Sequence, residues 1–264
     1  MIINCKEVAA KWKRECSSVN ATLAIIQIGN NPASNSYIKG KLKDCEEIGY
    51  TGLHYHLDEN VEEKVVLGLI EELNNDSQVN GIIVQLPLPK HLNENKIAKA
   101  IAPIKDVDGF IYDSPFTQCT PLGVSNLLDE IGYDVSGKFV VVLGRSENVG
   151  KTAANLLLNK NATVVICHSK TPDTIRKDLL LRADVIISAV GKAGLFSWEN
   201  VKQGALVIDV GINRTAEGKL CGDFIPPQDV DYLDYTSVPG GIGLLTRAML
   251  MKNTHQAYLL QNKI

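Results

Sequence analysis

The sequence predicts an α/β protein of two domains, each built around a mostly parallel sheet. Short apolar runs alternate with longer segments of helical periodicity along the chain. The run VVVL at 140–143 is continuously apolar, as in a strand that is buried on both faces, and Gly144 ends it. A turn-rich segment at 106–121 divides the alternating elements into two groups. These three observations together favour two α/β domains over one.

Each element follows from the spacing of its apolar residues and from the turn residues at its ends. In the first group, the predicted strands are 22–28, 51–57 and 81–86, and the predicted helices are 33–48, 61–75 and 93–100. In the second group, the predicted strands are 138–143, 163–167, 184–188 and 205–209, and the predicted helices are 150–159 and 171–182. A last helix at 244–262 is long enough to pack back on the first group.

Composition places the chain among globular proteins. Its 264 residues are 45% hydrophobic, which is enough to form a substantial core. The net charge of −3 and the scattered Lys and Arg residues give no basic surface for nucleic acid. No apolar run approaches the roughly 18 residues that span a bilayer, and the N-terminus has no signal-peptide core. We therefore expect a cytoplasmic protein with no nucleic-acid or membrane partner.

Cysteines and histidines show no pattern that is typical of a metal site. The six cysteines contain no CxxC pair and no spacing of a zinc site or disulfide framework, so we expect them to be reduced and structural. His54 and His56 alternate on a predicted strand and share a face, but no third ligand has a suitable spacing. We expect no metal.

The segment 138–158 indicates a phosphate-binding turn. A strand, a glycine turn that contains Arg145 and Ser146, and a helix follow one another. The start of such a helix aims unpaired N–H groups and the positive end of its dipole at an anion. The spacing GxxxxxG is also typical of an ordinary strand–turn–helix with a solvated arginine, so this segment alone leaves both interpretations open.

The residues after the next strand favour NADP over NAD. His168, Ser169 and Lys170 stand where a fold that prefers NAD has Asp or Glu for the ribose 2′-hydroxyl. Together with Arg145, they would instead favour a 2′-phosphate. A triphosphatase loop is the rival interpretation of 145–152. Arg145 occupies the place of the first glycine of such a loop, and the next strand ends without an Asp that could hold magnesium. Both observations count against a triphosphatase.

Candidate catalytic residues lie in the first group. Tyr37 and Lys41 are four residues apart on one predicted helix and share a face, with Ser34 one turn earlier. A Tyr/Lys pair on the protein surface without a catalytic role would have the same spacing, so the spacing alone does not identify a catalytic pair. Gln85 follows a buried strand at its carboxyl end, where open α/β sheets bind ligands. Asp108 in KDVDGF is by its position a turn residue or a part of the same site. An active site between the two groups is then expected.

Nine collinear segments give the chain a resemblance to the methylenetetrahydrofolate dehydrogenase/methenyltetrahydrofolate cyclohydrolase family over nearly its whole length. Their shared order makes the combination specific. The segments are SNSYIKGKLKDCEEIG (34–49), GIIVQLPLP (81–89), KDVDGF (105–110), CTPLG (119–123), GRSENVGK (144–151), ATVVICHSKT (162–171), ADVIISAVGK (183–192), VIDVGINR (207–214) and VPGGIG with TRAMLMKNT (238–254).

The resemblance implies a folate-binding catalytic domain at 1–117, onto which a C-terminal helix at 244–264 packs. It also implies a Rossmann-like NADP-binding domain at 118–243, a cleft between the two domains, and a homodimer formed through the nucleotide domains. The implied enzyme oxidises 5,10-methylenetetrahydrofolate with NADP⁺ and then hydrolyses the methenyl product to 10-formyltetrahydrofolate.

The resemblance also implies roles for residues at matching positions. Lys41 would be the main catalytic group, and Tyr37 would stack along the folate and orient Lys41. Gln85 would hydrogen-bond with the lysine, and Asp108 would hold the pterin. A partly desolvated lysine suits the hydrolysis, which needs a proton to be moved near neutral pH. The residues that would contact NADP are Gly144, Arg145, Ser146, Ser169 and Ile212.

The chain departs from the family pattern in three places. Only IYDSPFTQ at 111–118 lies between VDGF and CTP, where family members have a longer crossover. Leu244 and Thr152 stand where prolines are common in the family. The short crossover leaves the alternative of a dehydrogenase with weak or lost cyclohydrolase activity. A non-catalytic nucleotide-sensing module is a further alternative, but it would have no need of the four candidate catalytic residues. We therefore expect both activities.

Overall fold

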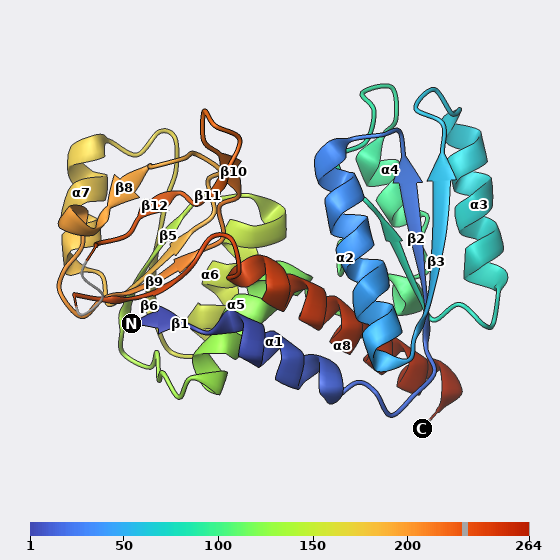
Figure 1. Cartoon of the computed structure of the whole chain (residues 1–264), viewed down its shortest axis with the longest axis horizontal. Helices are drawn as coiled ribbons and strands as arrows, with labels where there is room; N and C mark the ends of the chain where they lie inside the picture. Colours follow the sequence, from blue (N-terminus) through green and yellow to red (C-terminus); the bar gives the residue numbers. More distant parts are fainter. Residues whose placement is uncertain (229–231, 264) are drawn as a thin grey trace. The chain divides into compact units, whose positions relative to one another are not determined.

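The computed structural model describes residues 1–228 and 232–263. The chain forms two compact units, and each unit contains its own parallel sheet (Figure 1). The first unit comprises Met1–Ala9 with Thr120–Thr246, and the second comprises Ala10–Cys119 with Arg247–Ile264. The predicted α/β class is confirmed. Residues 1–9 lie with the later part of the chain and not with residues 10–117, because the first strand pairs with a strand near residue 235.

The main sheet of the first unit has six parallel strands in the order β1-β13-β9-β7-β5-β6. The strands are β1 (Ile2–Ile3), β5 (Phe139–Leu143), β6 (Thr163–Cys167), β7 (Val185–Ser188), β9 (Leu206–Asp209) and β13 (Asp234–Thr236). The chain passes from β5 to β6 on one side and then to β7 on the other side of β5. This reversal places the topological switch point at the carboxyl ends of β5 and β7, where sheets of this kind bind ligands.

The remaining elements of the first unit are helices and short strand pairs. Four of its helical segments are α6 (Thr152–Asn159), α7 (Asp173–Arg182), a π-helical turn η2 (Glu147–Lys151) and a 3-10 turn η3 (Trp198–Asn200). Helix α1 (Cys5–Arg14), of which only residues 5–9 belong to this unit, and helix α5 (Cys119–Glu130) were not predicted from the sequence. Two strand pairs complete the unit, β8 (Phe196–Ser197) with β12 (Phe224–Ile225) and β10 (Asn213–Arg214) with β11 (Leu220–Cys221).

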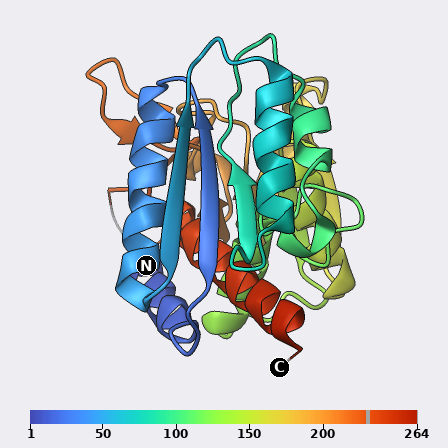
Figure 2. The same cartoon turned by 90° about the vertical axis from the view of Figure 1, so that its right-hand side faces the viewer.

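The second unit has a three-stranded parallel sheet in the order β3-β2-β4. Its elements are β2 (Thr22–Ile28), β3 (Thr51–Leu57), β4 (Gly81–Val84), α2 (Pro32–Ile48), α3 (Glu63–Asn75), α4 (Glu94–Lys99), the 3-10 turn η1 (Pro103–Lys105) and most of α8 (Ile242–Asn262). Figure 2 shows α2 and α3 on opposite sides of the strands. Apolar residues of α3 and α4, such as Ile70 and Ile97, pack with Ile26 and Ile82 of the strands into one core.

Helix α2 begins and ends at residues suited to those positions. The side chain of Asn31 accepts hydrogen bonds from the N–H groups of Ala33 and Ser34, and Pro32 occupies the first helical turn. Gly49 ends the helix with φ of 80°, a left-handed conformation that glycine adopts without steric cost. These caps fix which residues of α2 face the rest of the unit.

A buried carboxylate ties α2 to α1 and α8. Asp44 is 1% exposed, and its Oδ1 accepts hydrogen bonds from Lys13 Nζ at 2.7 Å and from Arg247 Nη2 at 3.1 Å. Arg247 Nε lies 2.7 Å from Asp44 Oδ2, close enough for an ion pair although it is not aligned as a hydrogen bond. Gly40 makes room for this arginine, because a Cβ at Gly40 would lie 1.9 Å from Arg247 Nη1.

Asp44→Ala is expected to lower the free energy of unfolding of the second unit by about 3 kcal/mol, because it leaves two partly buried cations, Lys13 and Arg247, without their shared partner. Urea unfolding followed by tryptophan fluorescence measures this loss. Trp12 lies in the second unit and Trp198 in the first, so a Trp198→Phe background isolates the relevant signal. Asp178→Ala is the control, because Asp178 pairs with Arg182 on the exposed face of α7. A loss at Asp44 no larger than that at Asp178 would contradict the assigned role.

Candidate functional site

The structure brings Lys41 and Gln85 into direct contact. Lys41 lies on α2 and is 8% exposed, and its Nζ donates a hydrogen bond to Gln85 Oε1 at 2.9 Å. Gln85 follows β4, and its Nε2 donates to Leu86 O at 2.9 Å. That second bond fixes the amide so that its oxygen faces the lysine. Ser34, one turn before Tyr37 on α2, donates from its Oγ to Leu86 O at 3.4 Å.

Tyr37 is half-buried on the same face of α2 as Lys41. Burial raises the pKa of its hydroxyl, and the positive charge of Arg247 opposes that rise. Tyr37 therefore stays protonated at neutral pH and can donate a hydrogen bond.

Asp108 is half-buried and lies within electrostatic range of Lys41. Burial raises the pKa of Asp108, while the charge of Lys41 and a hydrogen bond with Cys119 oppose the rise. The second unit thus gathers an amine, an amide, a phenol and a carboxyl group. All four predicted catalytic residues belong to this one unit.

The segment at 107–117, which contains Asp108 and most of the short crossover, is held near both ends by Asn253 of α8. Asn253 is 6% exposed, and its Nδ2 donates to Val107 O at 2.9 Å and to Thr117 O at 3.0 Å. Gly109 has φ of 71°, and a Cβ there would lie 2.7 Å from Phe116 O. The two arms of the crossover therefore approach closely, with no room for a side chain at residue 109.

Asp106 and Cys119 also support this crossover. Asp106 Oδ2 accepts a hydrogen bond from Ile111 N at 3.0 Å, and burial raises the pKa of Asp106 to about 6. Both residues lie in segments on which the resemblance rests, so the sequence contained a signal for them. Asn253 lies far away in sequence on the last helix, in the segment at 238–254 that also contributes to the resemblance, but its contact with residues 107 and 117 depends on the fold.

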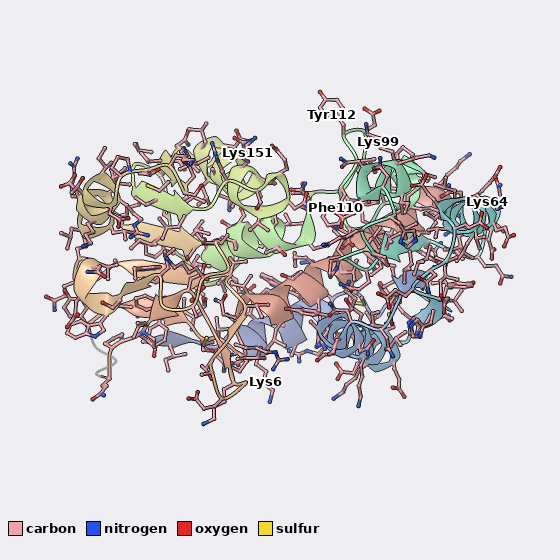
Figure 3. The ribbon with its side chains drawn as sticks, turned by 90° about the horizontal axis from the view of Figure 1, so that it is seen from above. Lys6, Lys64, Lys99, Phe110, Tyr112 and Lys151 are labelled. Carbon is pink, nitrogen blue, oxygen red and sulfur yellow. The ribbon has the colours of Figure 1, made fainter. Side chains whose placement is uncertain are left out.

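Two aromatic side chains of the crossover face solvent. Phe110 is 36% exposed, and Tyr112 is fully exposed. Figure 3 shows Tyr112 projecting outward from its loop. The short crossover thus presents aromatic surface beside the loop that contains Asp108.

The glycine turn of the first unit is as tight as its sequence predicted. Gly144 has φ of 109°, and a Cβ there would lie 2.4 Å from Ala189 O. A Cβ at Gly150 would lie 2.3 Å from Gly144 O. Ser146 caps the following π-helical turn by accepting a hydrogen bond from Gly150 N at 3.4 Å. The helical segment therefore begins at Glu147, three residues before the predicted start at 150.

The predicted cofactor residues lie at one edge of the six-stranded sheet. Gly144, Arg145 and Ser146 follow β5, and Ser169 follows the neighbouring β6. Ile212 is 47% exposed and follows β9, two strands from β5. All these loops leave the carboxyl ends of parallel strands, where nucleotides bind in folds of this kind.

The donor set at this edge fits NADP. Arg145, Ser169 and Lys170 are exposed, and no acid follows β6. His168 is turned toward its own loop, because its Nδ1 accepts a hydrogen bond from Lys170 N at 3.1 Å. A cationic and hydroxyl-bearing edge suits a 2′-phosphate.

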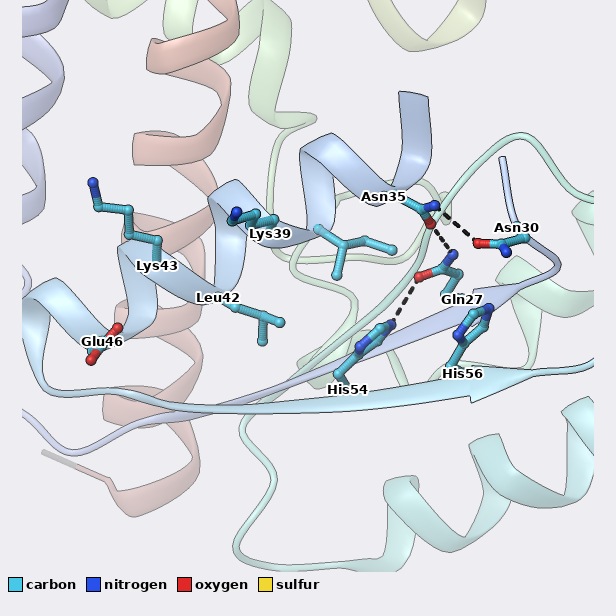
Figure 4. A pocket seen from close by; sticks show the side chains of 10 residues that line it. Gln27, Asn30, Asn35, Lys39, Leu42, Lys43, Glu46, His54 and His56 are labelled. Atoms are coloured by element: carbon cyan, nitrogen blue, oxygen red, sulfur yellow. Dashed lines mark hydrogen bonds between the residues drawn. The ribbon is translucent and has the colours of Figure 1, made fainter. Parts of the chain in front are cut away.

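A separate pocket of about 680 Å³ lies between α2 and β3 (Figure 4). Its wall includes Gln27, whose Nε2 donates to Asn35 Oδ1 at 2.6 Å and whose Oε1 bonds with His54 Nε2 at 2.9 Å. The lining residues of α2 lie on a different face from Tyr37 and Lys41. This pocket is therefore not part of the candidate site.

Residues 1–228 and 232–263 lack two further kinds of feature. No three side chains of His, Cys, Asp or Glu gather there in a way that could hold a metal ion. No helix within these residues combines the length and apolar character needed to cross a bilayer.

Comparison with known proteins identifies the family. Residues 3–108 match the family model of the tetrahydrofolate dehydrogenase/cyclohydrolase catalytic domain, and residues 118–262 match that of the NAD(P)-binding domain. The bifunctional protein FolD of Ruminiclostridium cellulolyticum is 48% identical over 280 aligned positions, which cover 99% of this chain and 98% of the relative.

Solved structures show the same similarity. The bifunctional enzyme FolD, a methylenetetrahydrofolate dehydrogenase/cyclohydrolase from Campylobacter jejuni, superposes with a TM-score of 0.93 at 41% identity and covers 100% of this chain and 99% of its own. A Trypanosoma brucei FolD, described as complexed with NADP cofactor and inhibitor, has a TM-score of 0.93 at 31% identity, with coverage of 100% and 99%. This chain therefore belongs to the tetrahydrofolate dehydrogenase/cyclohydrolase family.

Proposed function

We propose that this protein oxidises 5,10-methylenetetrahydrofolate with NADP⁺ and hydrolyses the 5,10-methenyl product to 10-formyltetrahydrofolate. The main support is the contact between Lys41 and Gln85 beside Asp108, in a chain whose full-length relatives are described as bifunctional. The anchoring of the short crossover by Asn253 supports both activities, because it keeps Asp108 within range of Lys41. Absorbance of NADPH and of the methenyl compound, recorded with NADP⁺ and NAD⁺ in parallel, tests the proposal.

Hydrolysis places the greater chemical demand on the second unit. Water must add to a cationic carbon and a proton must be moved, and Lys41 is the group that we assign to this transfer. Gln85 holds the ammonium by accepting its hydrogen bond, and its own amide is fixed by Leu86 O. Tyr37 lies on the same helix face and provides an aromatic ring and a hydroxyl donor to the folate.

Substrate orientation is assigned to Asp108. An ionised carboxylate accepts N–H hydrogen bonds from a pterin ring, and bonds of this charge-assisted kind are stronger than neutral ones. Because burial raises its pKa, the charge of Lys41 and the Cys119 hydrogen bond help Asp108 to remain ionised. The interaction between Asp108 and Lys41 thus links substrate binding to the catalytic lysine.

The cofactor is assigned to the carboxyl edge of the six-stranded sheet. Bound NADP⁺ supplies the acceptor for the hydride, which is chemistry that side chains do not provide. Gly144 and Gly150 let the backbone turn tightly at the phosphates, and Ser146 holds the start of the helix. Arg145 and Ser169 are assigned to the 2′-phosphate, and Ile212 to an apolar contact.

The two domains divide the proposed function between folate binding and NADP binding. We assign folate binding to the domain at 1–117 with the helix at 244–264, apart from the first nine residues, and NADP binding to the domain at 118–243. We further propose a homodimer formed through the nucleotide domains, which acts in the cytoplasm and provides one-carbon units for purine and amino-acid biosynthesis.

Lys41→Met is expected to lower the cyclohydrolase rate at least 100-fold, because general acid–base catalysis of this kind contributes roughly 10²–10⁴ to a rate. NADP⁺ affinity should remain near that of the unmodified protein, because the cofactor loops belong to the other unit. Decay of methenyltetrahydrofolate absorbance measures the first quantity, and calorimetric titration measures the second. Lys39→Met is the control, since Lys39 is exposed on another face of α2. Unimpaired hydrolysis by Lys41→Met would refute the assignment.

Arg145→Ala is expected to raise the Kd for NADP⁺ about tenfold or more, because a charge-assisted hydrogen bond to phosphate contributes roughly 1.5–3 kcal/mol. The Kd for NAD⁺ should change little, because NAD⁺ has no 2′-phosphate. Titration of both cofactors measures the difference. Arg182→Ala in α7 removes an exposed arginine of the same unit and serves as the control. Equal weakening of NADP⁺ and NAD⁺ would show that Arg145 does not read the 2′-phosphate.

A further inference from the structure

The loops that follow β7 and β9 are built around one buried carboxylate, Asp223. This residue is 0% exposed and lies between β11 and β12. Its two oxygens accept five hydrogen bonds, all from uncharged donors. The donors are Ser188 Oγ at 2.8 Å, Val190 N at 2.9 Å, Gly191 N at 3.2 Å, Lys192 N at 2.8 Å and Asn213 Nδ2 at 2.9 Å.

Asp223 thereby fixes one side of the switch point of the sheet. The loop at 189–192 leaves the carboxyl end of β7, and its first residue, Ala189, lies against Gly144 of the phosphate turn. The loop after β9 reaches Asp223 through Asn213, the residue that follows Ile212. Both loops therefore take their positions from the same carboxylate.

A second buried carboxylate locks this arrangement. Asp209 is 3% exposed and accepts hydrogen bonds from Gly211 N at 2.9 Å and Phe224 N at 2.8 Å. A Cβ at Gly211 would lie 2.2 Å from Asp223 Oδ1, and a Cβ at Gly222 would lie 1.9 Å from Asp209 Oδ2. Each carboxylate thus occupies space that a glycine beside the other leaves open, and the two loops cannot shift independently.

The hydrogen bonds determine which part of a cofactor suits this side of the switch point. The N–H groups of three successive residues, 190 to 192, are bonded to Asp223 and cannot bind a phosphate. The buried negative charge also disfavours a phosphate nearby. It favours a cation, and the nicotinamide ring of an oxidised cofactor is positively charged, whereas that of the reduced cofactor is neutral.

We propose that Asp223 is a positioning residue that shapes the nicotinamide end of the cofactor site, and that its buried charge favours the oxidised cofactor over the reduced one. The proposal rests on the NADP-dependent function proposed above. A phosphate turn at β5 and a negatively charged support behind the loops of β7 and β9 together define the direction in which the cofactor lies along the sheet edge.

Asp223→Asn tests the proposal in the full-length protein. The substitution keeps the size of the side chain, removes its charge, and turns one of its acceptors into a donor. Calorimetric titration gives the Kd values for NADP⁺ and NADPH separately. We expect the Kd for NADP⁺ to rise about tenfold, the effect of a unit charge over roughly 10 Å of protein. The Kd for NADPH should rise at least threefold less. Fluorescence of Trp198, which lies in the same unit as Asp223, reports whether that unit remains folded.

The control is Asp184→Asn, at a carboxylate that also pairs with Lys202 at 2.5 Å. Asp184 lies just before β7 at the opposite edge of the same sheet, and its Oδ2 also accepts a backbone hydrogen bond, from Phe139 N at 2.7 Å. Its loss should leave both Kd values within twofold of the unmodified protein. A comparable change at Asp184 in the ratio of the two Kd values would overturn the proposal.

Asn213→Ala provides a second test if Asp223→Asn does not fold. It removes one donor and leaves the charge of Asp223 less compensated, so both cofactors should bind more weakly but NADPH should lose more affinity than NADP⁺. An unchanged ratio of the two Kd values in either variant would overturn the proposal. If the unmodified protein bound neither cofactor, the proposed function itself would fall, a result distinct from binding with an unaltered ratio.

Discussion

Buried carboxylates must be compensated by hydrogen-bond donors or by cations, and this requirement organises both units of the protein. An ionised carboxylate without donors is too costly to keep in a protein interior. Asp44, Asp209 and Asp223 draw partners from segments that are distant in sequence, and Asp106 accepts a hydrogen bond from Ile111 N within its own loop. The same bonds that satisfy these charges hold α2, the crossover and the loops after β7 and β9 in place. Function therefore depends on groups that the substrates need not touch.

The strands and long helices could be predicted from the sequence because local patterns determine them. Strands β2, β3 and β6 have the predicted bounds, since each is a continuous or alternating apolar run that turn residues end. Helices α1 and α5 and strand β13 were missed for physical reasons. β13 has three residues, two of them polar, and it becomes a strand only by pairing with β1 and β9. Such pairing depends on tertiary structure and leaves little trace in a local window.

In the candidate site, too, local sequence determines some features and tertiary contacts determine others. Tyr37 and Lys41 share a helix face because of their spacing, and Gln85 ends a parallel strand, so both features followed from local sequence. The orientation of the Gln85 amide depends on Leu86 O, and the position of the crossover depends on Asn253 of the last helix. These contacts join segments that only the fold brings together. The candidate catalytic residues were thus easier to predict than the residues that position them.

Burial has a chemical consequence for the six cysteines. Cys5, Cys16, Cys45, Cys119 and Cys167 are buried, and burial raises the pKa of each of these thiols, so they remain protonated at neutral pH and react slowly with electrophiles. Cys221 is only partly buried and lies two residues before Asp223. A maleimide dye should therefore label Cys221 selectively in a chain that keeps all of its cysteines. The attached dye would then report motion near the proposed cofactor loops.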